Sequence, residues 1–193
     1  MISNKLISAL QKKLRSFDKK DMSPKKASES LTIVTKIVLP NDTNTMGKLF
    51  GGQLLAWMDE AASISAHRHS GSIAVTATVN NVSFNSPINH ASIVTLEAKV
   101  SRAFNTSMEV FIDVFVEDKL SQKKWKSNEA IYTFVALDDK GNPVHVPELI
   151  PESEEETERF NGALRRRQLA LILAGKMKPA DATELKRLFF EET

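Results

Sequence analysis

Two adjacent glycines, Gly51 and Gly52, stand directly before a long apolar segment that contains neither glycine nor proline. This segment, residues 53–69, is rich in Leu, Ala and Met and is predicted to form a helix of about four to five turns. Because glycine has no side chain, a ligand can approach the backbone closely where this helix starts. The free amides there, at the positive end of the helix dipole, can stabilise a developing oxyanion.

Asp59 is the carboxylate best placed for chemistry, about two turns into the predicted helix. On a helical wheel it borders the apolar stripe that contains Leu55 and Met58. Its neighbours on that flank, Ala62 and Ser63, are small and leave room for a substrate or for another chain. Asp59 is therefore a candidate general base. The alternative is a structural carboxylate held by hydrogen bonds, and the pattern alone leaves both open.

The other residue types that commonly carry chemistry give little support for a site. His67 and His69 are two residues apart, so on one helix they point about 200° away from each other and cannot share a metal ion. The chain has no cysteine, which excludes disulfides, thiolate catalysis and thiolate metal sites. The nucleophile motif Gly-x-Ser-x-Gly is also absent. We expect no metal site and no cofactor.

The elements that would position these residues are one strand, the helix and four further strands. Residues 31–39 are β-branched and apolar enough for a strand, and the helix follows a glycine-bearing loop. In residues 73–84 the apolar alternation slips at Asn80-Asn81, which predicts a β-bulge. The remaining predicted strands are residues 93–102, 108–117 and 130–137. A lone long helix can cover the apolar face of such a sheet, so we expect an α+β fold in which an antiparallel sheet wraps one central helix.

Both ends of the chain extend beyond this unit. Residues 1–30 carry eight Lys or Arg against three Asp or Glu, with apolar residues at helical spacing over residues 6–17. That pattern fits a membrane-surface helix, a helix docked on its own protein, or a frayed end. Residues 148–193 are predicted to form two helices, of which the first begins at a capping box of Ser153 and Glu156. The expected division is therefore 1–30, 31–147 and 148–193.

Composition limits the partners and the location. The net charge is only +2, which argues against nucleic-acid binding by the whole chain. No apolar run approaches the roughly 20 residues of a membrane span, and residues 1–20 lack the features of a secretory signal. We therefore expect no stable membrane association, and the absence of cysteine suits a reducing cytoplasm.

Residues 40–60 closely resemble the Asp-Thr-Asn…Gly…Phe-Gly-Gly…Asp signature of the cytosolic hotdog acyl-CoA hydrolases. These include bacterial broad-range thioesterases and the animal brain-type enzyme. The similarity covers roughly residues 31–147 and continues, in order and spacing, through residues 61–69, 84–88, 106–110 and 133–137. The resemblance implies the hotdog fold and hydrolysis of the thioester bond between a fatty acyl group and coenzyme A.

The resemblance also implies roles for matching residues. Asp59 would be the general base or nucleophile toward the thioester carbonyl, and Asn44 would orient that carbonyl or the attacking water. The amide of Gly52, together with Gln53, would donate to the oxyanion. In this family the asparagine and the aspartate of one site come from different subunits. A homodimer, assembled into a trimer of dimers, is therefore expected.

The remaining substrate contacts follow from the same resemblance, with one departure. The family often has Gly-Arg before the Thr-Ser-Met-Glu segment, where the chain contacts the nucleotide of coenzyme A, but this chain has Phe104 and Asn105 there. Arg102 or the cluster at residues 165–167 would have to replace that arginine, although such a cluster can also be a solvated helix face. The residues expected to contact the substrate are Gly51, Gln53, Phe84, Arg102, Thr106 and Ser107.

Two other functions are possible on this fold. A hydroxyacyl thioester dehydratase in its familiar forms uses a catalytic histidine with an acid, whereas Asp59 and Asn44 occupy the corresponding positions here. A non-catalytic acyl-CoA-binding module attached to a DNA-binding segment is the second alternative. Residues 1–30 are too short for a helix-turn-helix domain, which disfavours it.

Overall fold

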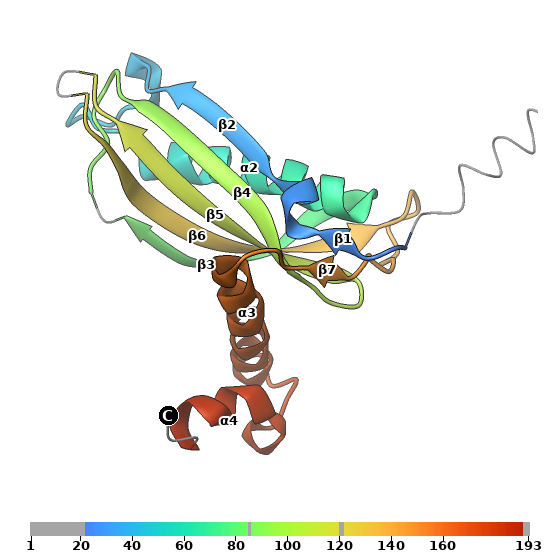
Figure 1. The fold of residues 1–193 in the computed structure, drawn as a ribbon. Coiled ribbons are helices and arrows are strands. Elements are labelled where there is room, and N and C mark those ends of the chain that lie inside the picture. The colour runs from blue at the N-terminus through green and yellow to red at the C-terminus, as the bar shows by residue number, and fades with distance from the viewer. Residues whose placement is uncertain (1–21, 85, 120–121, 191–193) are drawn as a thin grey trace, which may run out of the picture.

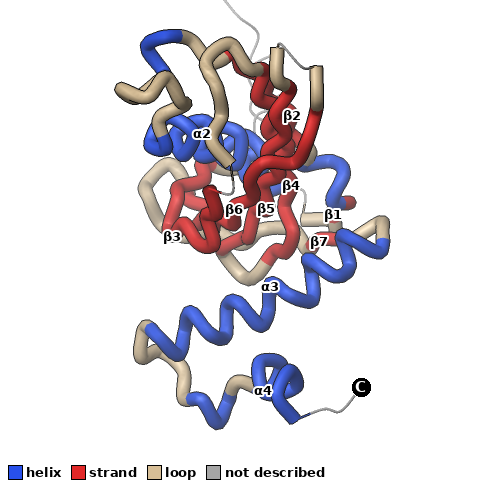
Figure 2. The backbone as a smooth tube through the Cα atoms, turned by 90° about the vertical axis from the view of Figure 1, so that its left-hand side faces the viewer, coloured by secondary structure: helices blue, strands red, loops and turns tan. Residues whose placement is uncertain are grey.

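The computed structural model describes residues 22–84, 86–119 and 122–190. A five-stranded antiparallel sheet has the order β2-β4-β5-β6-β3 and curves round helix α2, Gly51–Ser70 (Figure 1). Figure 2 shows α2 on one side of this sheet and helices α3 and α4 on the other. The strands are β2 (Thr32–Ile37), β3 (Ile73–Phe84), β4 (Ile93–Ala103), β5 (Ser107–Glu117) and β6 (Lys124–Leu137). The amphipathic pattern of residues 6–17 lies outside the described residues.

The core forms where the apolar face of the sheet meets α2. In β4 every second residue is buried, because alternate side chains of a strand point to one face. From α2, Met58, Ala61 and Ala62 are fully buried against this face. The small alanines let the helix approach the sheet closely, and the predicted α+β hotdog arrangement is confirmed.

The strands agree with the predicted segments except at β6. The bulge predicted at Asn80-Asn81 is present as a register shift between Asn80 and Ser83, and a second shift lies between Thr76 and Thr78. β6 begins at Lys124, six residues before the predicted start at residue 130. Its first half is mostly polar, so the apolar pattern did not reveal it. β3 is one of the two edge strands, and large apolar side chains are exposed on it at Ile73, Val75 and Val79.

The predicted N-terminal extension is partly packed on this body. Strand β1, Lys25–Lys26, pairs in parallel with β7, Leu149–Ile150, and leads into the 3-10 turn Ala27–Ser30. Ala27 is buried, and the hydroxyl of Ser30 accepts a hydrogen bond from the Val100 amide at 3.0 Å. Because residues 25–30 pack against the rest of the protein, the division of the chain at residues 30 and 147 stays a prediction from the sequence. Two further 3-10 turns are Pro40–Asp42 and Pro179–Asp181.

The predicted C-terminal helices are α3, Glu154–Leu173, and α4, Thr183–Phe190. Ser153 caps α3, because its hydroxyl accepts a hydrogen bond from the Glu156 amide at 3.2 Å. The reciprocal bond of the predicted capping box instead joins the Glu156 carboxylate to the amide of Glu152. Gly162 inside α3 leaves space for the Arg166 guanidinium, since a Cβ there would lie 2.7 Å from Nη1. This guanidinium helps to anchor α3 on the sheet.

Candidate active site

Asn44 lies in the loop before α2 and is held by its own turn. Its Oδ1 accepts hydrogen bonds from the amides of Met46 at 2.9 Å and Lys48 at 3.2 Å. These bonds fix the orientation of the side-chain amide. Among the described residues, Nδ2 has no hydrogen-bond acceptor, so it is available to donate to a ligand. Asn44 lines a cavity of about 430 Å³ together with Gly51, Phe84 and other residues.

The start of α2 presents backbone donors beside this cavity. Phe50 precedes the helix in an extended conformation and gives no side-chain cap. The amide of Gln53 donates to the Phe50 carbonyl at 2.9 Å, whereas those of Gly51 and Gly52 have no acceptor among the described residues. Of the two predicted oxyanion donors, the amide of Gly52 is therefore the one that is free to donate to a ligand. A Cβ at Gly52 would lie 3.0 Å from the Phe50 ring, which explains why glycine suits the position.

Asp59 meets a partner that the sequence pattern did not reveal. The hydroxyl of Thr76, on the edge strand β3, donates to Oδ1 of Asp59 at 2.6 Å. Asp59 is half-buried and Thr76 is exposed. An exposed threonine is common in strands, so only the packing of β3 on α2 identifies this one as a neighbour of the carboxylate.

A neutral aromatic residue lies near Asp59. Tyr132 on β6 is almost fully buried, and its hydroxyl donates to the Leu55 carbonyl at 3.2 Å, one turn before Asp59. Burial, and then the negative charge of Asp59, raise the pKa of Tyr132 to about 12. Tyr132 is therefore protonated at neutral pH and adds no charge beside the carboxylate.

One chain does not bring Asn44 and Asp59 together. The rise of an α-helix places Asp59 about 10 Å beyond Gly52 along α2. Asn44 lines the cavity at the start of the helix, and Asp59 is not among the described residues that line it. Within one chain, the two predicted catalytic residues therefore do not line the same cavity.

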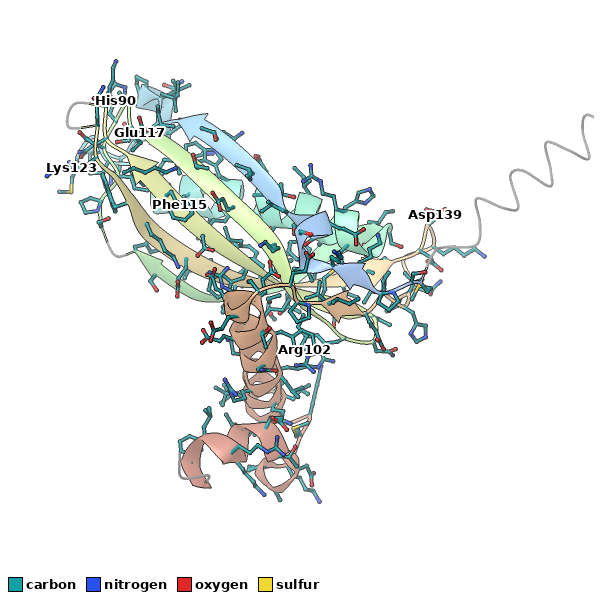
Figure 3. The ribbon with its side chains drawn as sticks, viewed as in Figure 1. His90, Arg102, Phe115, Glu117, Lys123 and Asp139 are labelled. Atoms are coloured by element: carbon teal, nitrogen blue, oxygen red, sulfur yellow. The ribbon has the colours of Figure 1, made fainter. Side chains whose placement is uncertain are left out.

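The predicted substrate contacts fall into two groups. Phe84 and Gly51 share the cavity with Asn44. Arg102 instead lies beside α3, far from His90 and Glu117 at the opposite end of the sheet (Figure 3). Its guanidinium is 4.0 Å from the centre of the Phe160 ring, and Nη1 donates to the Phe160 carbonyl at 2.9 Å.

Ser107 belongs to the same group as Arg102, because its hydroxyl accepts a hydrogen bond from Nη1 of Arg167 in α3 at 3.0 Å. Burial lowers the pKa of Arg102, an effect opposed by the negative charges of Glu184 and Glu109. Thr106 lies next to this group. Its backbone carbonyl accepts a hydrogen bond from the Ala136 amide of β6 at 2.9 Å.

Within residues 22–84, 86–119 and 122–190, no cluster of three or more His, Asp or Glu side chains is arranged to hold a metal ion. In the same ranges no helix is long and apolar enough to cross a membrane.

Comparison with known proteins places this geometry in a family. The profile of the thioesterase superfamily matches residues 46–122. The uncharacterized acyl-CoA thioester hydrolase YkhA of Bacillus subtilis is 42% identical over 138 residues, which are 72% of this chain and 80% of that protein. This chain belongs to the acyl-CoA thioesterase family. Mouse acyl-coenzyme A thioesterase 11 is 41% identical over 145 residues, or 75% of this chain, but the match spans only 24% of its length. The human cytosolic acyl coenzyme A thioester hydrolase is 32% identical over 81% of this chain and 42% of its own length.

Solved structures of acyl-CoA thioesterases have the same fold. An acyl-CoA hydrolase from Bacillus cereus superposes with a TM-score of 0.76 at 38% identity, covering 86% of this chain and 99% of that one. One from Staphylococcus aureus, in complex with butyryl coenzyme A and coenzyme A, gives 0.73 at 37% identity and covers 79% and 94%. A hexameric acyl-CoA thioesterase gives 0.74 at 32% identity and covers 88% and 99%.

The Staphylococcus aureus enzyme has also been solved as alanine variants of an asparagine, an aspartate and a threonine. Those three residues are separated along that chain by the same intervals that separate Asn44, Asp59 and Thr76 here. This agreement brings Thr76, found through its contact with Asp59, into the candidate site of this thioesterase.

Proposed function

We propose that this protein is an acyl-CoA thioesterase that hydrolyses fatty acyl-CoA to a free fatty acid and coenzyme A. The observation that carries the proposal is the Asp59 carboxylate, held by Thr76 on the flank of α2 in a member of the acyl-CoA thioesterase family. The amide nitrogen of Asn44 and the open amide of Gly52 supply donors for the thioester carbonyl.

The proposed reaction begins with a water molecule beside Asp59. The carboxylate takes a proton while the water oxygen bonds to the thioester carbon, and the carbonyl oxygen becomes negatively charged. The amide of Gly52 stabilises this oxyanion, with Asn44 orienting the carbonyl or the water. When the carbon–sulfur bond breaks, the thiolate leaves and is protonated, which gives the fatty acid and coenzyme A. The substrate brings its own coenzyme A, so the proposal includes no cofactor.

Asp59 can also act as the nucleophile. It would then form a mixed anhydride with the acyl group and release the thiolate before water enters. Two measurements separate the two roles. Label in the Asp59 carboxylate after repeated turnover in ¹⁸O-labelled water, or an acyl adduct on Asp59 after a rapidly quenched single turnover, supports the nucleophile. Absence of both supports the general base.

A multimer is part of the proposal. Asn44 and Asp59 lie apart in one chain, and exposed apolar residues lie on strand β3, whose outer edge pairs with no other described strand. A second copy of the chain can cover this edge and complete each site with its own Asn44. Because related thioesterases are hexameric, we propose a trimer of dimers for this chain. Light scattering that showed a fully active monomer would exclude this arrangement.

A cytoplasmic location is proposed on the same basis. The mammalian relatives at 32–33% identity are cytosolic acyl coenzyme A thioester hydrolases, although the match covers only 42% of their length. Cell fractionation with an antibody against the native chain tests the location. Recovery in a membrane fraction after a salt wash would contradict it.

The activity itself is tested by mixing purified protein with fatty acyl-CoA and a thiol reagent. Release of free thiol at a rate proportional to enzyme concentration is the expected result. A hydrated or dehydrated acyl chain with the thioester intact would indicate a dehydratase, and binding without turnover would indicate a non-catalytic module. A series of acyl chain lengths would then define the preferred substrate.

A further inference from the structure

A second cavity, of about 300 Å³, lies between α3 and the sheet, on the face opposite α2. Its walls come from β3, β5, β6 and α3. Three of the lining residues are cations, Arg166, Arg167 and Lys176, and one is an acid, Glu109. The charges of these four side chains sum to a net positive value at neutral pH. This balance favours an anionic ligand.

The two neighbouring arginines differ in what neutralises them. Arg166 binds both carboxylate oxygens of Glu109, through Nε at 3.0 Å and Nη2 at 2.7 Å. Arg167 binds the neutral hydroxyl of Ser107 at 3.0 Å and lies 4.2 Å from the centre of the Phe104 ring. Among the described residues, no carboxylate lies within ion-pair distance of Arg167. One of the two guanidinium groups therefore keeps its charge uncompensated.

The surroundings of Arg167 make that charge costly. The side chain is partly buried, and burial lowers the pKa of its guanidinium. A partly desolvated cation is stabilised by an anion that enters the same site. Because the guanidinium is planar with several N–H donors, it matches the oxygens of a phosphate group especially well.

The rest of the cavity suits a nucleotide rather than a bare phosphate. Thr78, Asn80 and Thr133 supply hydroxyl and amide groups that can bind a sugar, whereas Ala170 and Leu171 supply an apolar wall. Lys176 adds a second cation, and no ion pair to it is found in the described part of the chain. A ligand with several phosphates, a ribose and a flat base uses all three kinds of surface.

We propose that this cavity binds the phosphate-bearing nucleotide end of the coenzyme A group, with Arg167 as the principal phosphate ligand and Lys176 as a second. The identity of the nucleotide rests on the proposed acyl-CoA thioesterase function. The phosphate preference rests only on the charges and contacts of the cavity. In this arrangement the C-terminal helix α3 contributes to substrate affinity, although it is remote from the thioester chemistry.

The test compares two substrates with the same acyl group, one ending in coenzyme A and the other in pantetheine, which lacks the nucleotide. Replacing Arg167→Met keeps most of the side-chain length and removes the charge. Loss of a charge-assisted hydrogen bond should raise KM for acyl-CoA about ten- to a hundredfold and leave kcat nearly unchanged. Turnover of acyl-pantetheine should not change, because it makes no contact with Arg167.

The matched control is Arg165→Met, which removes a charge from the same helix at a position outside the cavity lining. It should leave KM for acyl-CoA unchanged. Arg167→Lys, which keeps the charge, should recover part of the affinity, whereas a loss caused only by poorer folding would not depend on the charge at this position. Equal effects of Arg165→Met and Arg167→Met, or equal loss with both substrates, would overturn the proposal.

Adenosine 3′,5′-bisphosphate distinguishes the two sources of such a nucleotide. Calorimetric binding that weakens in Arg167→Met, together with competitive inhibition against acyl-CoA, supports the substrate's own nucleotide end. Binding without competition would assign the cavity to a separate nucleotide and overturn the substrate assignment. Absence of binding would overturn the site itself. If the protein hydrolysed no thioester yet bound the bisphosphate through Arg167, the thioesterase proposal would fail while the phosphate site remained.

Discussion

The hydroxyl of Thr76 donates a 2.6 Å hydrogen bond to Oδ1 of Asp59 and so joins the edge strand β3 to helix α2. A hydrogen bond from a hydroxyl to an ionised carboxylate is shorter and stronger than one between neutral groups. It fixes the rotamer of Asp59 and occupies one of its two oxygens. The other oxygen has no partner among the described residues and remains available to a water molecule or to the substrate.

Thr76→Val should reduce turnover while leaving the fold intact. Valine has nearly the shape of threonine but lacks the hydroxyl, so the Asp59 carboxylate loses its fixed orientation. We expect kcat to fall about tenfold, which corresponds to the free energy of one hydrogen bond to a charged group. KM should change little. Steady-state kinetics with a saturating acyl-CoA substrate measure both constants.

Thr76→Ser is the matched control, because it restores the hydroxyl while removing only a methyl group. It should recover most of the lost kcat. If the Val and Ser variants were equally active or equally impaired, the hydroxyl would not be what positions Asp59.

Asp59→Asn should have a larger effect, because it removes the group that accepts the proton. Asparagine is nearly isosteric with aspartate, so the fold and the contact with Thr76 can survive. Turnover should fall at least ~100-fold, as is typical when a general base is lost. Thiol release at substrate saturation measures the loss, and circular dichroism checks the fold. Near-normal turnover by a folded variant would rule out the proposed role of Asp59.

Much of the fold was predictable because its elements have clear periodicity. The alternating residues of β4 and the glycine-free run that follows Gly52 in α2 predict a strand and a helix directly. The start of β6 was not predictable, because its first residues are polar. Lys126 in that part of the strand pairs with Asp113 at 2.7 Å and with Glu129 at 2.8 Å on the outer face of the sheet. The pair with Asp113 on β5 depends on the register between strands, which a single strand's pattern does not contain.

The candidate site was predictable only in part, for the same reason. Asn44, Gly52 and Asp59 lie within one short stretch of sequence, where a family signature is recognisable. Thr76 is close to Asp59 only because β3 packs beside α2. Arg167 is close to Ser107 only because α3 folds back over the sheet. Neighbours that depend on tertiary packing leave no periodic signal in the sequence.

The ion pair between Arg166 and Glu109 should stabilise the attachment of α3 to the sheet. Glu109 is only 4% exposed, and its carboxylate also accepts the hydroxyl of Ser101 at 2.6 Å. Arg166→Met would leave a buried carboxylate without its cation. We expect the free energy of unfolding to fall by about 3 kcal/mol, as for other buried pairs that lose one partner. Urea denaturation at fixed protein concentration measures the change.

The double variant Arg166→Met/Glu109→Gln is the control for this prediction. It replaces the Glu109 carboxylate, which Arg166→Met leaves without its cation, by a neutral amide. The double variant should therefore be more stable than Arg166→Met alone. If the single variant lost less than about 1 kcal/mol, the pair would behave as an ordinary surface salt bridge.

Mixing an Asn44→Ala protein with an Asp59→Ala protein should restore activity that neither has alone. Asn44 and Asp59 lie apart in one chain, so a complete site is proposed to take one from each of two subunits. A mixed dimer then has one site with both alanines and one site with neither. With random exchange, half of the dimers are mixed, so activity should recover to about a quarter of wild type per chain, as two-fold symmetry requires.

Subunit exchange is verified independently by native mass spectrometry of the mixture, using a small mass tag on one variant. Titrating the ratio of the two proteins should give maximal activity at equal amounts, because mixed dimers are then most abundant. Mixing two samples of the same variant under identical conditions controls for contaminating activity. Absence of recovery despite demonstrated exchange would place Asn44 and Asp59 in a site formed by a single chain. In that case the separation of the two residues along α2 would have to close through a rearrangement of the loop that carries Asn44.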